Sequence, residues 1–292
     1  MFVDAIEIVG GFTRPIFTIG RKYGSSKVTP GAGTMFFVND QGWALTTRSI
    51  AQVILKATEI DRRYADFCKE KNAILRAENF EDELKVLETK YNYTDKSIAQ
   101  MKVSFFDCVD KFTGFECKLH NKYDIAAIKM DGWEKVLYKG HAVFAGQGDE
   151  IKPGKSVCRI GYPFPEFTNF AYDVEKDDIC WTNEGKKVSP RFPMNGMVTR
   201  LLSDGTALAG IEVGTVGPMG LNGSPLFDKN GTIYGMQVGL NKLKLCQCIH
   251  VDIIKDFLTK ENIPFFEGPK RESDKKGKFE LLHAGSISAK MS

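Results

Sequence analysis

The sequence predicts an all-β fold. Its 292 residues include 28 glycines, and much of the chain consists of short apolar runs that end at turn-forming Gly, Pro, Asn or Asp residues. A hydrophobic content of 42% is enough to bury a sizeable core. The net charge of +3 is too small to indicate a nucleic-acid partner, and no apolar run approaches the length of a membrane span. We therefore expect a globular chain with neither nucleic acid nor membrane as a partner.

The N-terminal segment carries acids, Asp4 and Glu7, where a secretion signal needs a basic region and then an unbroken apolar stretch. The seven cysteines are odd in number and irregularly spaced, which does not fit a framework of disulfides. We therefore expect reduced thiols and a cytoplasmic location, although an exported protein without its leader would show the same pattern. For Ile8 to Gly11 we expect a strand that ends in glycines.

Residues 31–50 predict a β-hairpin. Two apolar runs, 31–38 and 43–50, flank an Asn-Asp-Gln-Gly turn, and a turn of this composition between apolar runs is a strong hairpin signal. Further strands are expected at residues 101–108, 115–120, 122–130, 197–200, 210–213 and 246–251, and within residues 152–163, where a Pro/Gly turn precedes an apolar strand. A short amphipathic helix follows at 252–258, and from Glu267 onward the Lys, Ser and Gly content predicts a mobile tail.

Residues 56–101 differ from the rest because they are charged and contain neither glycine nor proline. Phe80, Leu84, Leu87 and Tyr91 follow helical spacing, and Asn79 is a suitable N-cap. We predict a pair of helices inserted between two strands. Two interpretations stay open: a hairpin that packs on itself and on the sheet, or a lid that binds a partner.

Residues 217–239 are the most informative stretch. Small and turn-prone residues at 220–225 lead into Leu226 and Phe227, a turn follows at 228–231, and strand formers resume at Thr232. The pattern predicts a loop that presents a side chain, followed by a hairpin.

Four segments resemble the trypsin-like (chymotrypsin-fold) serine proteases, in particular their bacterial high-temperature-requirement type. Residues 31–50 resemble the family's Gly-x-Gly-Phe-x-Val hairpin, residues 122–130 its Asp-Ile-Ala-Val-Leu-Lys strand, residues 152–163 its strand ending in Gly-Tyr-Pro, and residues 220–227 its Gly-x-Ser-Gly-Gly-Pro-Leu-Phe loop. The resemblance spans residues 10–262. It implies two packed six-stranded β-barrels at 1–140 and 141–265, a helical insertion in the first barrel, and a tail at 266–292.

The resemblance places the three catalytic positions of the family at Ser49, Asp124 and Asn222. Only the aspartate is retained, because Ser49 stands where the family has histidine and Asn222 where it has the nucleophilic serine. A hydroxyl is no base near neutral pH, and an amide cannot form an acyl-enzyme. If Asp124 is buried it needs other partners, and we expect the Ser49 hydroxyl and backbone N–H groups to supply them.

A binding surface is expected to survive this loss. The backbone N–H groups of Gly220 and Asn222 would form a nest like an oxyanion hole. The strand edge that the resemblance assigns to peptide pairing consists of Met236, Gln237, Val238 and Gly239.

The function expected from these features is that of a catalytically inactive pseudoprotease that binds a polypeptide or acts as a scaffold. The alternative is a cytosolic serine endopeptidase with relocated catalytic groups. Cys246, Cys248 and His250 alternate along one strand, which is a poor arrangement for tetrahedral zinc, so no metal and no cofactor is expected. The oligomeric state stays open.

Overall fold

A computed structural model describes residues 1–216, 218, 220–268 and 282–283. The first part of the chain forms a six-stranded sheet in the order β4-β1-β2-β3-β6-β5. Its strands are β1 (Thr13–Lys22), β2 (Val28–Phe37), β3 (Trp43–Thr46), β4 (Ile98–Phe105), β5 (Gly114–Leu119) and β6 (Ala126–Asp131). Across the described residues, β4 and β5 do not pair, so this sheet is a half-barrel.

The second sheet closes on itself. Six of its strands run in the order β13-β8-β11-β12-β15-β14, and an additional pairing of β13 with β14 completes the ring. These strands are β8 (Ser156–Gly161), β11 (Phe192–Ser203), β12 (Leu208–Val216), β13 (Pro225–Phe227), β14 (Thr232–Leu240) and β15 (Leu245–His250). Numbered within each sheet, both follow the order 4-1-2-3-6-5. This repeated topology confirms the predicted all-β fold of two barrels, the first of them open.

Three short strands extend the second sheet beyond its ring: β7 (Val143–Phe144), β16 (Phe266–Glu267) and β17 (Leu282–His283). β16 runs parallel to β7. The expected mobile tail therefore begins with two residues that belong to a sheet. The remainder of that expectation falls mostly on residues 269–281 and 284–292, which lie outside the described residues.

One hydrophobic core joins the two sheets. It contains Phe36 and Phe37 of β2, Phe227 of β13 and Tyr234 of β14, all with 0% exposure. Phe37 also stacks on Tyr138, with ring centroids 3.6 Å apart. The strands of both sheets, and the loops that connect them, are thus held by one shared hydrophobic core.

The chain begins with a helix, α1 (Val3–Phe12), where a strand was expected for Ile8 to Gly11. Ala5, Val9 and Phe12 are buried and lie on one helical face. A Cβ atom on Gly10 would lie 1.9 Å from the Arg191 guanidinium, so this glycine permits close packing and does not end a strand. The strand expectation was therefore wrong.

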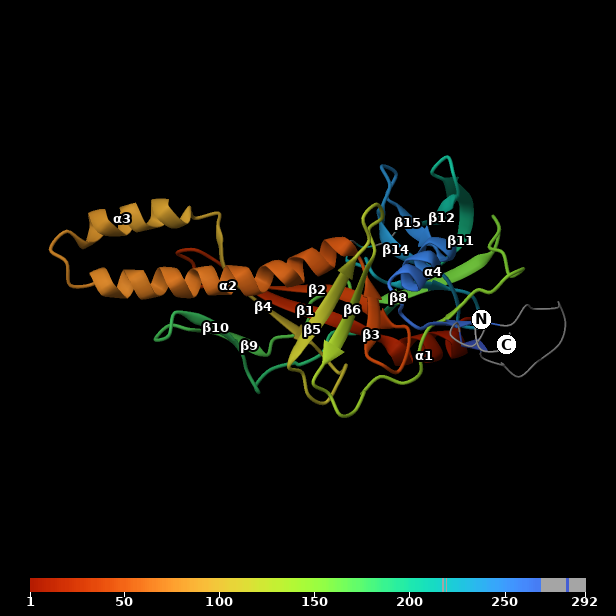
Figure 1. Cartoon of the computed structure of the whole chain (residues 1–292), viewed down its shortest axis with the longest axis horizontal. Coiled ribbons are helices and arrows are strands. Elements are labelled where there is room, and N and C mark those ends of the chain that lie inside the picture. Colours follow the sequence, from red (N-terminus) through yellow and green to blue (C-terminus); the bar gives the residue numbers. More distant parts are fainter. Residues whose placement is uncertain (217, 219, 269–281, 284–292) are drawn as a thin grey trace, which may run out of the picture.

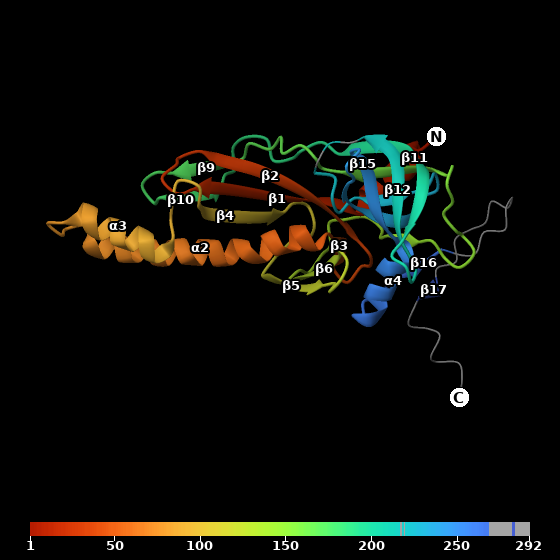
Figure 2. The same ribbon diagram turned by 90° about the horizontal axis from the view of Figure 1, so that it is seen from above.

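The helical insertion consists of α2 (Arg48–Ile74) and α3 (Phe80–Tyr91). Figures 1 and 2 show that α3 lies along α2 and that the far ends of both project beyond the first sheet. Because α2 begins at Arg48, residues 48–50 are helical and do not extend the preceding strand as expected. The remaining helix, α4 (Val251–Lys260), follows β15 and agrees with the short helix expected there. Of the helices described, none is both long and apolar enough to cross a membrane.

A small hairpin of β9 (Phe170–Asp173) and β10 (Asp178–Trp181) was not expected from the sequence. In the sequence this hairpin lies between β8 and β11 of the second sheet. In space it lies beside β1 and β4 of the first sheet (Figure 2). Phe17, Ile19, Phe167 and Ile179 form a separate buried cluster beneath it. The hairpin therefore links the second half of the chain to the first.

Candidate functional site

Ser49 and Asp124 are in contact. Asp124 Oδ1 accepts hydrogen bonds from the Ser49 backbone N–H at 2.8 Å and from the Ser49 hydroxyl at 3.0 Å. These are the partners expected for the carboxylate. Ser49 lies in the first turn of α2, where Thr47 is the N-cap and accepts from the Ile50 N–H at 3.2 Å.

The Asp124 carboxylate therefore anchors a helix end. Two of the free N–H groups in the first turn of α2 are satisfied, one by Thr47 and one by Asp124. A negative charge at this end also suits the helix dipole. Arg48 donates to the carbonyls of His120 and Asn121 at 3.0 Å, which ties the same turn to the loop before Asp124.

Replacing Asp124 with alanine is expected to lower the free energy of unfolding by about 1 kcal/mol, since it removes an accepting group from the start of α2. Ser49→Ala removes only the exposed hydroxyl bond and should cost about 0.5 kcal/mol. Urea denaturation of both variants measures the difference. Equal losses would show that the backbone hydrogen bond to Asp124 contributes nothing.

The loop around Asn222 is shaped by glycines. Gly220 and Gly223 have φ values of 106° and 86°, in the region that favours glycine. A Cβ atom on Gly223 would lie 2.0 Å from the Thr34 carbonyl oxygen, so no other residue fits there. Asn222 between them is partly exposed, and its side chain makes no hydrogen bond to a described residue.

The predicted peptide edge is only partly open. Met236 pairs with Pro225 on one side and with Ile249 on the other. The Gln237 backbone accepts from the Gly223 N–H at 2.8 Å and donates to the Ser224 carbonyl at 2.9 Å. Both side chains are buried. The available part of the predicted edge therefore shortens to Val238 and Gly239, which are partly exposed.

Ser224, two residues after Asn222, is not placed as a nucleophile. Ser224 is 0% exposed, and its hydroxyl has no hydrogen-bond partner among the described residues. A Cβ atom added to Gly161 would lie 2.2 Å from its oxygen, so the hydroxyl faces the second sheet. A catalytic serine at this position would need to be accessible to the substrate and to lie within hydrogen-bond reach of a base.

The three histidines with described side chains have structural contacts. His120 Nδ1 accepts from the N–H groups of Lys122 and Tyr123 at 3.0 Å. His250 Nδ1 accepts from the Asp252 N–H at 3.2 Å and caps α4. His141 stacks on Phe266 with centroids 3.9 Å apart. None of these hydrogen bonds to His120 and His250 involves Asp124.

All seven cysteines are free. Cys246 and Cys248 are buried, with sulfur atoms 3.5 Å apart. The Nδ1 atom of His250 accepts the hydrogen bond that caps α4. No cluster of three or more His, Cys, Asp or Glu side chains suited to a metal occurs among the described residues.

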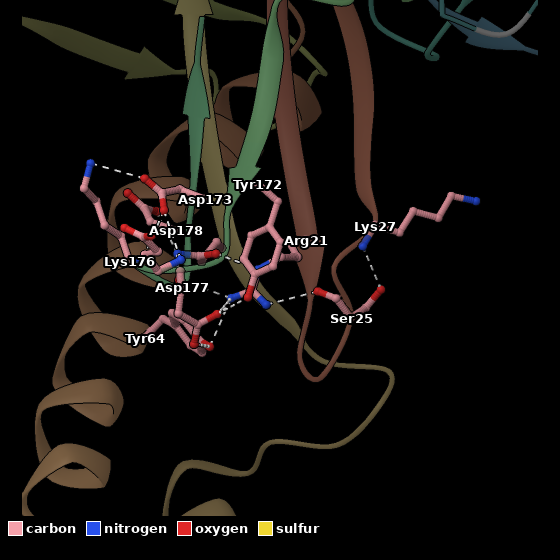
Figure 3. Close-up of polar contacts among 11 residues, drawn as sticks. Arg21, Ser25, Lys27, Tyr64, Tyr172, Asp173, Lys176, Asp177 and Asp178 are labelled. Atoms are coloured by element: carbon pink, nitrogen blue, oxygen red, sulfur yellow. Dashed lines mark hydrogen bonds and ion pairs between the residues drawn. The ribbon is translucent and has the colours of Figure 1, made fainter.

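A second polar site, which sequence reasoning missed, joins the helical insertion to the β9–β10 hairpin. Figure 3 shows Tyr64 of α2, Tyr172 of β9 and Asp177 converging on Arg21 of β1. Arg21 Nη2 donates to Asp177 at 2.8 Å, and each tyrosine hydroxyl donates to the same carboxylate at 2.6 Å. Arg21 Nε also donates to Gln100 of β4 at 2.7 Å. We call these residues the Arg21–Asp177 joint.

In the joint the positive charge of Arg21 is buried, and the negative charge of Asp177 is partly exposed. Arg21 has a side-chain exposure of 3%, and Asp177 of 32%. Burial alone would raise the pKa of Asp177, but hydrogen bonds from Tyr172 and Tyr64 and the charge of Arg21 lower it overall. No local motif marks these residues, because they come from four separate elements.

Comparisons with known proteins establish the fold. No family model matches the sequence, and no curated protein matches it either. A solved structure described as the HtrA-type protease AlgW with decapeptide is similar at a TM-score of 0.50 and 13% identity. The similarity covers 89% of this chain and 67% of that one. At this identity it shows the fold alone, and it confirms the expected trypsin-like, HtrA-like double barrel.

Proposed function

We propose that this chain is a catalytically inactive protein of trypsin-like fold that binds a polypeptide segment beside the Asn222 loop. One observation carries the proposal: both hydrogen-bond donors of Ser49, its hydroxyl and its backbone N–H, donate to Asp124. The carboxylate that would orient a catalytic imidazole thus binds the start of a helix.

The chemistry of acyl transfer supports inactivity. The reaction needs a nucleophile and a base within hydrogen-bond reach of each other. Asn222, at the nucleophile position of the loop, has an amide in place of a hydroxyl, and Ser224 is buried. Asp124 without an imidazole cannot activate either residue.

Peptide binding is supported by the geometry that remains. Gly220 keeps the turn that would direct backbone N–H groups outward, and Val238 and Gly239 leave a short strand edge partly exposed. The HtrA-type structure is described with a decapeptide, which makes a short extended peptide the ligand class to test first. A scaffold role with this cleft closed is the alternative outcome.

A fluorophosphonate probe tests inactivity. We expect intact mass to show no adduct after exposure to the probe, while an active trypsin-like protease labels fully in parallel. A stoichiometric adduct would contradict the proposal, and peptide mapping would then identify the nucleophile of a relocated active site.

Peptide binding is tested by filling the edge. A Cβ atom on Gly239 meets no atom within 4 Å, so Gly239→Phe should fold normally and block the edge. Gly114→Phe is the matched control, because Gly114 also has open space and lies on β5 of the other sheet. We expect peptides selected from a display library to lose at least about tenfold in affinity with Gly239→Phe only. Equal binding by both variants would exclude this edge.

A further inference from the structure

A cavity of about 620 Å³ lies where α1 meets β1 and the segment just before β11. This volume is in the range of sites that hold a small organic ligand. Three aromatic rings line the cavity, those of Phe17, Phe106 and Tyr162. Phe17 is 2% exposed and Tyr162 6% exposed, and the ring centroids of Phe17 and Phe106 are 6.0 Å apart. The cavity therefore offers aromatic surfaces to a flat apolar group.

Two of the charged residues in the lining, Arg14 and Asp107, form an ion pair with each other. Arg14 is 8% exposed, and its Nη2 lies 3.4 Å from the Asp107 carboxylate. The same guanidinium donates to the backbone carbonyls of Gly10, Thr13, Asp107 and Leu137 at 2.7 to 3.2 Å. Arg14 is therefore compensated in charge, and all its donors are in use within the chain.

Two further cations in the lining have no such partner. The side chains of Lys139 and Arg191 are exposed and form no hydrogen bond or ion pair with a described residue. Arg191 is nevertheless held against α1, since a Cβ atom on Gly10 would lie 1.9 Å from its Nη1. Glu7, the other acid in the lining besides Asp107, also forms no ion pair with a described residue. Two cations against this one acid leave the cavity with an excess of positive charge.

These two cations do not cap the C-terminus of α1 with their side chains. The Gly10 carbonyl accepts from the Arg14 guanidinium at 3.2 Å, and the Gly11 carbonyl accepts from the Lys139 backbone N–H at 2.8 Å. The acceptors that a cation usually meets at a helix C-terminus are thus already bonded. The Arg191 guanidinium lies on a glycine and keeps its donors for a group from outside the described chain.

We propose that this cavity binds a small aromatic carboxylate. The Arg191 guanidinium holds the carboxylate, because its planar fork matches that group with two parallel hydrogen bonds, and Lys139 adds a second positive charge. The aromatic body of the ligand lies against Phe17 and Phe106. Asn222 does not line this cavity, so the site is separate from the proposed peptide site and is tested independently of it.

Titration of the full chain, labelled with nitrogen-15, with 2-naphthoate and with 2-naphthamide tests the proposal. The two probes share one ring system and differ in charge. We expect 2-naphthoate to bind at least about tenfold more tightly than 2-naphthamide, with the largest amide shifts at Gly10, Gly11 and Ser189, which line the cavity. Equal affinity for the two probes, no binding of 2-naphthoate, or shifts confined to other parts of the chain would overturn the proposal.

Arg191→Met tests the role of the guanidinium, because methionine keeps an apolar side chain without the charge. Affinity for 2-naphthoate should fall by at least about tenfold, whereas affinity for 2-naphthamide should stay within about threefold of the unchanged protein. Arg76→Met is the matched control, since Arg76 is also exposed and lies between α2 and α3, outside the cavity. Equal affinity of both variants for 2-naphthoate would contradict the role of Arg191.

Val188→Trp tests the cavity itself without a change of charge. Val188 lines the cavity and is 45% exposed, so the fold should accept a larger side chain there while the cavity is partly filled. Both probes should then lose at least about tenfold in affinity. Undiminished binding of both probes by Val188→Trp would show that they bind elsewhere, and the proposed site would be wrong.

Discussion

Asp177→Ala is expected to lower the free energy of unfolding by about 3 kcal/mol. The change leaves the Arg21 guanidinium, which is 3% exposed, without its only carboxylate in the joint. It also removes the acceptor that Tyr64 and Tyr172 share. Because Asp177 itself is 32% exposed, water partly replaces it, and we expect the lower end of the range for broken buried pairs. Urea denaturation measures the loss.

Two variants separate the ion pair from general damage to the hairpin. Glu175→Ala removes an exposed acid from the same turn and should change stability by less than about 0.5 kcal/mol. Arg21→Met in the Asp177→Ala background removes the unpaired cation, so the double variant should be more stable than Asp177→Ala alone. Further destabilisation by Arg21→Met would show that the loss does not come from the buried charge.

The same joint predicts an acid dependence. The folded-state pKa of Asp177 lies below its ordinary value of 3.8, so the native state favours the ionised carboxylate. Its stabilisation is therefore complete above that value and is lost as the pH falls through the folded pKa. Asp177→Asn should lose this contribution to the acid dependence, as measured by unfolding at a series of acidic pH values. An unchanged acid dependence in Asp177→Asn would contradict the assignment.

Local signals predicted two hairpins of the fold well, whereas the double barrel was an implication of the resemblance. The apolar runs around the turn at residues 39–42 became β2 and β3, and the stretch after Gly223 became β13 and β14. Such hairpins are specified by adjacent residues. The prediction failed at residues 48–50, because the apolar run ends before the polar residues Thr47, Arg48 and Ser49, and the Thr47 cap begins a helix there. Cap and strand signals overlap there, and the contact with Asp124 favours the helix.

The candidate site was predictable only where a motif marked it. The contact between Ser49 and Asp124 followed from the resemblance of two short segments. The joint between Arg21 and Asp177 spans 156 positions, and it depends on the unexpected hairpin that contains Tyr172. Periodicity shows that a segment is a strand or a helix, but it does not show which distant side chain a buried arginine meets.

The projecting helical arm is held by an aromatic cluster centred on Phe67. Phe67 is 0% exposed and packs with Tyr64, Leu87 and Tyr93, which are all buried. Its ring lies 5.0 Å from that of Tyr93 and 5.5 Å from that of Tyr23, in edge-on geometry. This cluster is separate from the main core, so the arm depends on its own packing.

Phe67→Ala is expected to lower the stability of the arm by about 3 to 5 kcal/mol, because it leaves a cavity at the centre of this cluster. Val86→Ala on α3 is the control: Val86 is 71% exposed, and its truncation should cost less than about 0.5 kcal/mol. Hydrogen exchange should show the loss in the outer half of α2 and in α3, while the strands of both barrels keep their protection. Equal loss of protection in the arm and the barrels would instead show that the insertion folds as one unit with the barrels. Intact protection of the arm in Phe67→Ala would show that the aromatic cluster does not hold it.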